Sequence, residues 1–320
     1  MLKKLITYFL FAVLFFPACD APRENPLDPE NPDNPFTSIS GIVRTVSFPN
    51  QPIANVNVFW DKANVLVKTN FSGSFIIKDV KPEEGYLYFE KQGYSPDSTK
   101  ITWNDRKNIS ITQQLNSIPK MIDGSIISSV ANRYGNIQVY KVTVNVEIVD
   151  DENDVDSVFI KNNDLEIEKV LDNTSVTVFE NEFSPSELNL SSIDDVIGRE
   201  FEIVAKESNG KEFNIAQLTV KRIIKESIET LSPLNNEVIQ DTLTLNWRRF
   251  TPGYPFHYFL QIYTNTVEPD LVWEKNNISS DKILFDVSNP PSPGNYFWVV
   301  WAIDEFGNRA RSLPATFTIE

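Results

Sequence analysis

Cysteine, histidine and glycine are scarce in this chain of 320 residues, which contains one cysteine, one histidine and 11 glycines. Cys19 and His257 alone cannot supply the ligands of a zinc site or a Cys-His catalytic pair. A Ser-His-Asp triad would need His257, and no Gly-x-Ser-x-Gly elbow is present. The few glycines form no phosphate-binding loop. Paired carboxylates abound, but glycosidase sites lie in clefts of larger folds, so we expect no enzymatic activity.

Positive charge is also in short supply. The chain has 29 Lys and Arg against 44 Asp and Glu, a formal net charge of −15. Because phosphate backbones are bound by basic surfaces, nucleic acid is not an expected partner. Direct adhesion of the protein surface to anionic lipid is disfavoured for the same reason.

The one long apolar run lies at the N-terminus. Leu5 to Phe16 follows Lys3 and Lys4 and precedes Pro17-Ala18, the pattern of a secretory signal. It is shorter than the roughly 20 residues that span a bilayer. Residues 16–19, Phe-Pro-Ala-Cys, resemble the lipobox of bacterial lipoproteins, although that family prefers Leu first and Ala or Ser second. The resemblance implies a signal peptide over residues 1–18 and a lipid on Cys19, which would attach the protein to a membrane. The alternative is an ordinary secretory signal with an incidental cysteine.

Residues 19–37 form a proline-rich linker behind the predicted anchor. Pro26, Pro29, Pro32 and Pro35 recur every third residue, matching the turn of polyproline II. We expect a stalk, or alternatively a disordered linker of no fixed length. The predicted location is the cell envelope, at the outer membrane or cell surface rather than the inner membrane.

Period-two alternation dominates the rest of the chain. Examples are Val142, Val144 and Val146, and Leu243, Leu245 and Trp247. The only helical candidate, Pro185 to Ile197, has room for one or two turns. Turn residues between these runs predict an all-β protein of three tandem β-sandwiches, over residues 38–116, 117–225 and 226–320.

The first predicted sandwich contains four short motifs: Gly41-Ile42-Val43, Pro52 to Val58, Thr69 to Phe75, and Lys91 to Tyr94. With these motifs it resembles the carboxypeptidase regulatory-like domain, a transthyretin-like fold of seven strands. Asn70 stands where that family usually has Asp. Either side chain can close the turn by binding its own backbone, and Gly73 supplies a positive φ. The resemblance implies a fold and is silent about function.

The third predicted sandwich has Trp247 at the end of one strand, Tyr258, Leu260 and Ile262 in the next, a long strand from Gly294 to Asp304, and a Gly307-Asn308 turn. With these residues it resembles a fibronectin type III or related immunoglobulin-like module. The middle sandwich alternates in the same way and is predicted to be immunoglobulin-like, without a specific motif.

An acidic loop in the middle sandwich is a candidate calcium site. Residues 150–156 contain five carboxylates and Asn153, and oxygen ligands at this density suit Ca²⁺. The candidate ligands are Asp151, Asn153 and Asp156. The spacing differs from that of an EF-hand, and a polar hairpin turn explains the same residues without a metal. No other cofactor is expected.

An aromatic face on the third sandwich is the candidate binding site. If Tyr258, Leu260 and Ile262 face the core, Phe259 and Tyr263 face outward, and the same alternation turns Phe297, Val299 and Trp301 outward. The two strands are neighbours in this fold, so Phe259, Tyr263, Phe297 and Trp301 share one predicted patch. Such a patch suits a sugar or a partner protein. Alternatively, it packs against the middle sandwich.

Together these features predict a non-catalytic, lipid-anchored envelope protein that presents its sandwiches for binding or scaffolding. The expected partner is a glycan or another envelope protein. The alternative is an accessory subunit of a secretion or uptake assembly, in which the sandwiches act as spacers.

Overall fold

The structure is a computed structural model that describes residue 31 and residues 36–320. The predicted signal peptide, Cys19 and most of the linker lie outside the described residues. Residues 36–320 form 23 strands and no α-helix, which confirms the predicted all-β class. No helix within the described part is long and apolar enough to cross a bilayer. The chain divides into two compact units, one ending at Ile118 and one beginning at Pro119.

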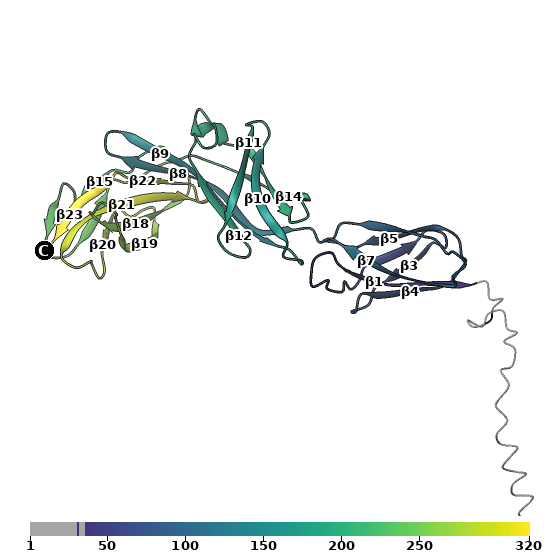
Figure 1. Cartoon of the computed structure of the whole chain (residues 1–320). Coiled ribbons are helices and arrows are strands. Elements are labelled where there is room, and N and C mark those ends of the chain that lie inside the picture. The colour runs from purple at the N-terminus through teal and green to yellow at the C-terminus, as the bar shows by residue number, and fades with distance from the viewer. Residues whose placement is uncertain (1–30, 32–35) are drawn as a thin grey trace, which may run out of the picture. The chain divides into compact units, whose positions relative to one another are not determined.

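The first unit is a sandwich of two sheets (Figure 1). One sheet has the order β4-β1-β7, with β1 parallel to β7, and the other has the order β3-β2-β5-β6. Alternate residues of β1 face the core, among them Ile39 and Val43. The strands are β1 (Thr37–Thr45), β2 (Asn57–Trp60), β3 (Val65–Lys68), β4 (Ser74–Val80), β5 (Gly85–Glu90), β6 (Asp97–Ile101) and β7 (Asn108–Leu115).

The predicted turn before β4 forms through the Asn70 side chain. Asn70 Oδ1 accepts hydrogen bonds from the backbone N–H groups of Ser72 and Ser74, both at 3.0 Å. Gly73 has a φ of 73°, as expected for the residue that reverses the chain. Gly41 is required for a different reason, since a Cβ there would lie 2.6 Å from the carbonyl oxygen of Ile111.

The first half of the second unit holds the middle sandwich. Its core contains Val144, Ile160 and Phe201, all fully buried. The single helical turn of this region, η2 (Ile193–Val196), falls inside the predicted short connection and is capped by Ser192. The strands are β8 (Lys120–Arg133), β9 (Ile137–Val149), β10 (Val155–Asn162), β11 (Ile167–Asn173), β12 (Val178–Phe183), β13 (Glu200–Glu207) and β14 (Glu212–Thr219).

The second half of this unit holds the C-terminal sandwich. Trp247, Tyr258 and Trp298 are fully buried in its core, as the alternation predicts. The strands are β15 (Thr230–Ser232), β16 (Glu237–Ile239), β17 (Thr244–Trp247), β18 (Phe256–Thr264), β19 (Leu271–Ser279), β20 (Leu284–Asp286), β21 (Gly294–Asp304), β22 (Arg309–Arg311) and β23 (Ala315–Ile319).

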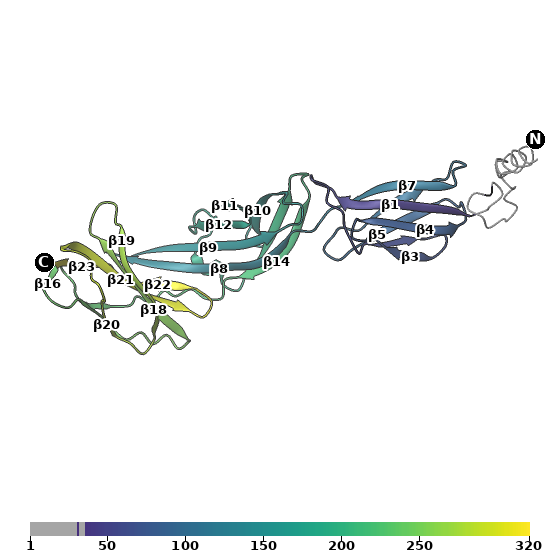
Figure 2. The same ribbon diagram turned by 90° about the horizontal axis from the view of Figure 1, so that it is seen from below.

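The two halves of the second unit share one sheet. The short strand β22 pairs with β21 on one side and, in parallel, with the far half of β8 on the other. Figure 2 shows β8 and β9 running alongside β21 and β22. The continuous order is therefore β14-β13-β10-β11-β12-β9-β8-β22-β21-β18-β19 within the described residues. The middle and C-terminal sandwiches are thus fused at a sheet edge rather than linked only by a flexible segment.

A buried polar network reinforces this junction. Asn308 Oδ1 accepts a hydrogen bond from the backbone N–H of Ser128 at 2.9 Å, and Asn308 Nδ2 donates to Asp304 Oδ2 at 3.2 Å. Asp304, with its side chain fully buried, also pairs with Arg222 Nη1 at 2.8 Å. The Arg222 guanidinium lies 3.8 Å from the ring centroid of Tyr254. Because each buried polar group has a partner, the network fixes the two sandwiches in one arrangement.

Candidate functional site

The structure brings the four predicted aromatic residues together on adjacent strands. β18 and β21 pair in antiparallel register, with Phe259 opposite Trp301 and Tyr263 opposite Phe297. Residues directly opposite in a ladder point to the same face of the sheet. Phe259, Tyr263, Phe297 and Trp301 therefore form one surface, here called the aromatic face.

Two interactions hold the rings of the aromatic face in place. Tyr263 and Phe297 stack, with ring centroids 5.2 Å apart and planes inclined by 13°. Gln261 lies between Tyr263 and Trp301, and its Oε1 accepts hydrogen bonds from Tyr263 OH and Trp301 Nε1, both at 2.9 Å. Gln261 is a functional candidate that sequence reasoning missed, although it alternates in phase with Phe259 and Tyr263.

The four rings are half-buried, and none belongs to an identified hydrophobic core cluster of the second unit. Val299 lies on the same side of the sheet, as predicted, but it is fully buried. Its neighbours on the same strand face are Phe297 and Trp301, and its cross-strand partner is Gln261. Large side chains on three sides explain why so small a residue is covered.

Besides the strand pairing, a small hydrophobic cluster joins the two sandwiches on the opposite side of the shared sheet. Val130, Ile224 and Ala310 form a small buried cluster there, packed against Tyr140 and Phe250. Ala310 is flanked in β22 by Arg309 and Arg311, which alternate to the other side of the strand. The aromatic face is thus on the side of the sheet away from this cluster.

Arg309 and Arg311 extend the aromatic face across β22. Arg311 lies directly opposite Trp301 in the ladder, and the guanidinium carbons of Arg309 and Arg311 lie 5.2 Å and 5.7 Å from the Trp301 ring centroid. Cation-π contacts at these distances stabilise both the ring and the cations. Burial lowers the pKa of Arg311, Tyr263 opposes that shift, and the nearby positive charge of Arg133 lowers it further. These arginines were also missed from the sequence, where only their alternation around Ala310 hints at a shared face.

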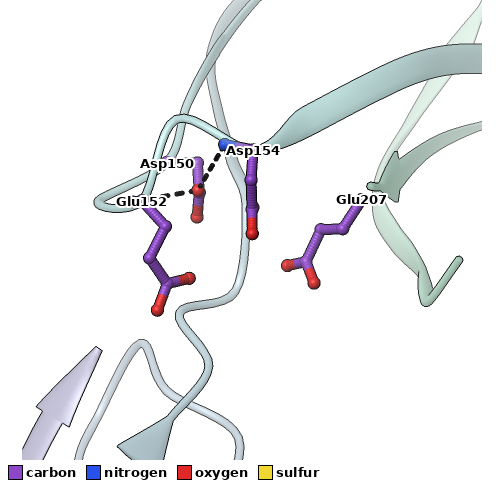
Figure 3. A group of neighbouring side chains, drawn as sticks. All are labelled: Asp150, Glu152, Asp154 and Glu207. Atoms are coloured by element: carbon purple, nitrogen blue, oxygen red, sulfur yellow. Dashed lines mark hydrogen bonds between the residues drawn. The ribbon is translucent and has the colours of Figure 1, made fainter. Parts of the chain in front are cut away.

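The acidic loop lies between β9 and β10. Asp150 Oδ2 accepts hydrogen bonds from the backbone N–H groups of Glu152 at 3.0 Å and Asp154 at 3.4 Å, which curls the loop around its first carboxylate. Figure 3 shows the side chain of Glu207, at the end of β13, directed toward this loop. One carboxylate oxygen from each of Asp150, Glu152, Asp154 and Glu207 lies within 4.8 Å of the others.

The carboxylates that gather at this loop are not the predicted ligands. Asp151, Asn153 and Asp156 are exposed and lie outside the group of four. Asn153 has a φ of 53°, so the chain reverses there and the side chains do not alternate as in a strand. Glu207 comes from a strand more than 50 residues away, and no local pattern identifies it. Four carboxylates at this spacing suit a hard divalent cation such as Ca²⁺.

No protein-family model and no curated protein matches this chain. Similar solved structures include the fibronectin(III)-like modules of Clostridium thermocellum CbhA, at 14% identity and a TM-score of 0.28, covering 63% of this chain and 93% of that chain. The FN1-FN3 domains of chicken CNTN1 match at 11% identity and a TM-score of 0.32, covering 83% and 90%. BcpA, the major pilin subunit of Bacillus cereus, matches at 12% identity and a TM-score of 0.28, covering 89% and 95%. Values this low transfer no activity or partner to this chain.

Proposed function

We propose that this chain is a non-catalytic envelope protein, attached to a membrane by a lipid on Cys19, whose aromatic face binds glycans. The observation that carries the proposal is the register of β18 and β21, which places Phe259, Tyr263, Phe297 and Trp301 side by side on one face. The flat C–H face of a sugar ring packs well against an aromatic ring, and several rings in a row suit a chain of sugars.

Preorganisation supports this role for the aromatic face. Tyr263 stacks on Phe297 and both Tyr263 and Trp301 are hydrogen-bonded to Gln261, so these side chains have little rotamer freedom left to lose. A ligand that meets rings already held in position avoids about 0.5–1.5 kcal/mol of ordering free energy per side chain.

The test is glycan-array screening of the full chain followed by calorimetry on the glycans it binds. We expect Tyr263→Ala and Trp301→Ala each to weaken binding about tenfold, a change of roughly 1.4 kcal/mol. The matched control is Phe71→Ala, which removes a ring that is 95% exposed in the first unit. If Trp301→Ala lowers the melting temperature and leaves glycan affinity unchanged, the face is structural and the proposal fails.

A scaffolding role, with an envelope protein as the partner, is the second candidate. The continuous strand pairing from β14 to β19 supports it, since a shared sheet makes the second unit a stiff spacer. In this second proposal the chain is an accessory subunit of a secretion or uptake assembly, and its sandwiches act as spacers. Crosslinking in intact cells distinguishes the two, because a stoichiometric membrane partner together with no glycan binding favours the assembly role.

We further propose that the first unit is a carboxypeptidase regulatory-like domain. Seven strands in two sheets and the Asn70 turn support this assignment. It assigns no binding activity to that unit.

A further inference from the structure

A group of arginines stands at one end of the aromatic face. Trp301, Arg311 and Ala131 occupy one row across β21, β22 and β8, and Arg133 lies two residues beyond Ala131 on the same face of β8. Ile303 and Arg309 occupy the adjacent row. Three arginines therefore lie on one sheet face of a chain whose net charge is −15.

These arginines have no acidic partner within the part of the chain that the structure describes. The salt bridges found there include none with Arg133, Arg309 or Arg311, whereas other arginines of the second unit, such as Arg222, are paired. Glu274 of β19 also lies on this face, and its carboxylate accepts a hydrogen bond from Gln261 on the side away from β22. Lys141 lies opposite Ser129 in the next strand and is paired with Glu182.

Arg309 and Arg311 also lack hydrogen-bond partners for their buried Nε atoms within the described residues. Neither side chain donates a hydrogen bond to those residues. Packing against Trp301 holds both guanidinium groups in place. Partly desolvated cations without a counter-charge are unfavourable, and a bound carboxylate would offset that cost through two parallel N–H···O bonds.

We propose that Arg309, Arg311 and Arg133 bind carboxylate groups of an acidic glycan, a chain of uronic acid residues, which lies along the aromatic face. The inference rests on the proposed glycan-binding function and specifies its substrate class. Sugar rings pack against Tyr263 and Phe297, while the arginines contact the carboxylates at the β22 end. Arginine suits this role because its planar fork matches a carboxylate, and lysine is a poor substitute.

The experiment measures binding of the full chain to polygalacturonate, alginate and hyaluronan, each compared with its methyl ester. Esterification removes the negative charge and leaves the sugar backbone unchanged. We expect at least one of the acids to bind at least tenfold more tightly than its ester, with affinity that falls as salt is added. This comparison needs no variant, so it does not depend on how well a substituted protein folds.

Variants then locate the site. We expect Arg309→Gln and Arg311→Gln each to weaken binding of the acid about tenfold more than binding of the ester, because both changes also remove a cation-π contact with Trp301. Arg311→Lys should recover only part of the loss. The matched control is Arg199→Gln, which removes one charge near Asp164 on the middle sandwich.

The outcomes separate the two proposals. Equal affinity for acid and ester, together with sensitivity to Tyr263→Ala, overturns the inference and leaves glycan binding standing. Tight binding of acids that is unaffected by the Arg309 and Arg311 substitutions also overturns it. If neither acids nor esters bind and the glycan array is empty, the proposed function itself fails and the inference with it.

Discussion

Asn308 Oδ1 accepts a hydrogen bond from the backbone N–H of Ser128, at 2.9 Å, across the junction of the middle and C-terminal sandwiches. Both residues are fully buried, and they are 180 residues apart in the chain. The bond therefore links the turn before β22 directly to β8, the strand with which β22 pairs in parallel.

The junction bond predicts a stability change. We expect Asn308→Ala to lower the free energy of unfolding of the second unit by about 1–3 kcal/mol, because the Ser128 N–H is left buried without an acceptor. Urea unfolding monitored by tryptophan fluorescence measures it. Asn163→Ala, at an exposed position, is the control and should change stability by less than about 0.5 kcal/mol. An unchanged unfolding midpoint for Asn308→Ala would contradict the role given to this network.

Alkaline pH tests the same junction. Burial, and then the negative charge of Glu226, raise the pKa of Tyr254 from 10.0 to about 12. A raised pKa means that the folded state holds the phenolic proton more tightly, so this stabilisation is complete below pH 10.0 and is lost as pH rises toward about 12. We expect Tyr254→Phe to lose less stability over that range than the unsubstituted chain. Equal losses, measured as urea midpoints, would show that Tyr254 titrates normally.

Calcium binding remains a prediction, and the structure changes the residues through which it is tested. We expect millimolar Ca²⁺ to raise the melting temperature, since a ligand at 100 times its Kd adds about 2.7 kcal/mol. Combined substitution of Asp154→Asn and Glu207→Gln should abolish the rise. Asp151→Asn and Asp156→Asn, outside the group of four, serve as controls and should retain it. No rise in the unsubstituted chain would end the calcium hypothesis.

Lipid attachment is tested at Cys19. We expect the protein to enter the detergent phase on phase partitioning and Cys19→Ser to remain in the aqueous phase, because the chain has no other cysteine to acylate. Mass spectrometry of the N-terminal peptide is the direct readout. An unmodified thiol at Cys19 in the processed protein would favour the ordinary secretory signal.

Alternation along single strands was enough to predict the core and the outward rings. Tyr258, Leu260, Trp298 and Val300 are buried as expected because each strand has one face on a core and side chains alternate strictly. The pairing of β18 with β21 followed from the resemblance to a known architecture. Burial of Val299 was missed because alternation gives the direction of a side chain and not the size of its neighbours.

Contacts between segments far apart in the sequence could not be predicted from alternation along single strands. The pairing of β22 with β8 joins residues about 180 positions apart through a strand of three residues, too short to leave a pattern. The proximity of the Glu207 and Asp150 carboxylates likewise depends on where β13 ends relative to the loop between β9 and β10. Such features follow from the register between strands, which one sequence does not encode locally.

The three-residue strand β22 also limits how this protein can be divided into fragments. Because β22 borders β8 in parallel, excising residues 226–320 would strip one side of β22 of its backbone partners and leave a bare edge able to recruit foreign strands. We therefore do not expect residues 226–320 to behave as an independent domain when they are separated from β8. A fragment that contains the C-terminal sandwich therefore needs the β8-β9 hairpin to cover this edge. The two sandwiches are expected to fold as one unit.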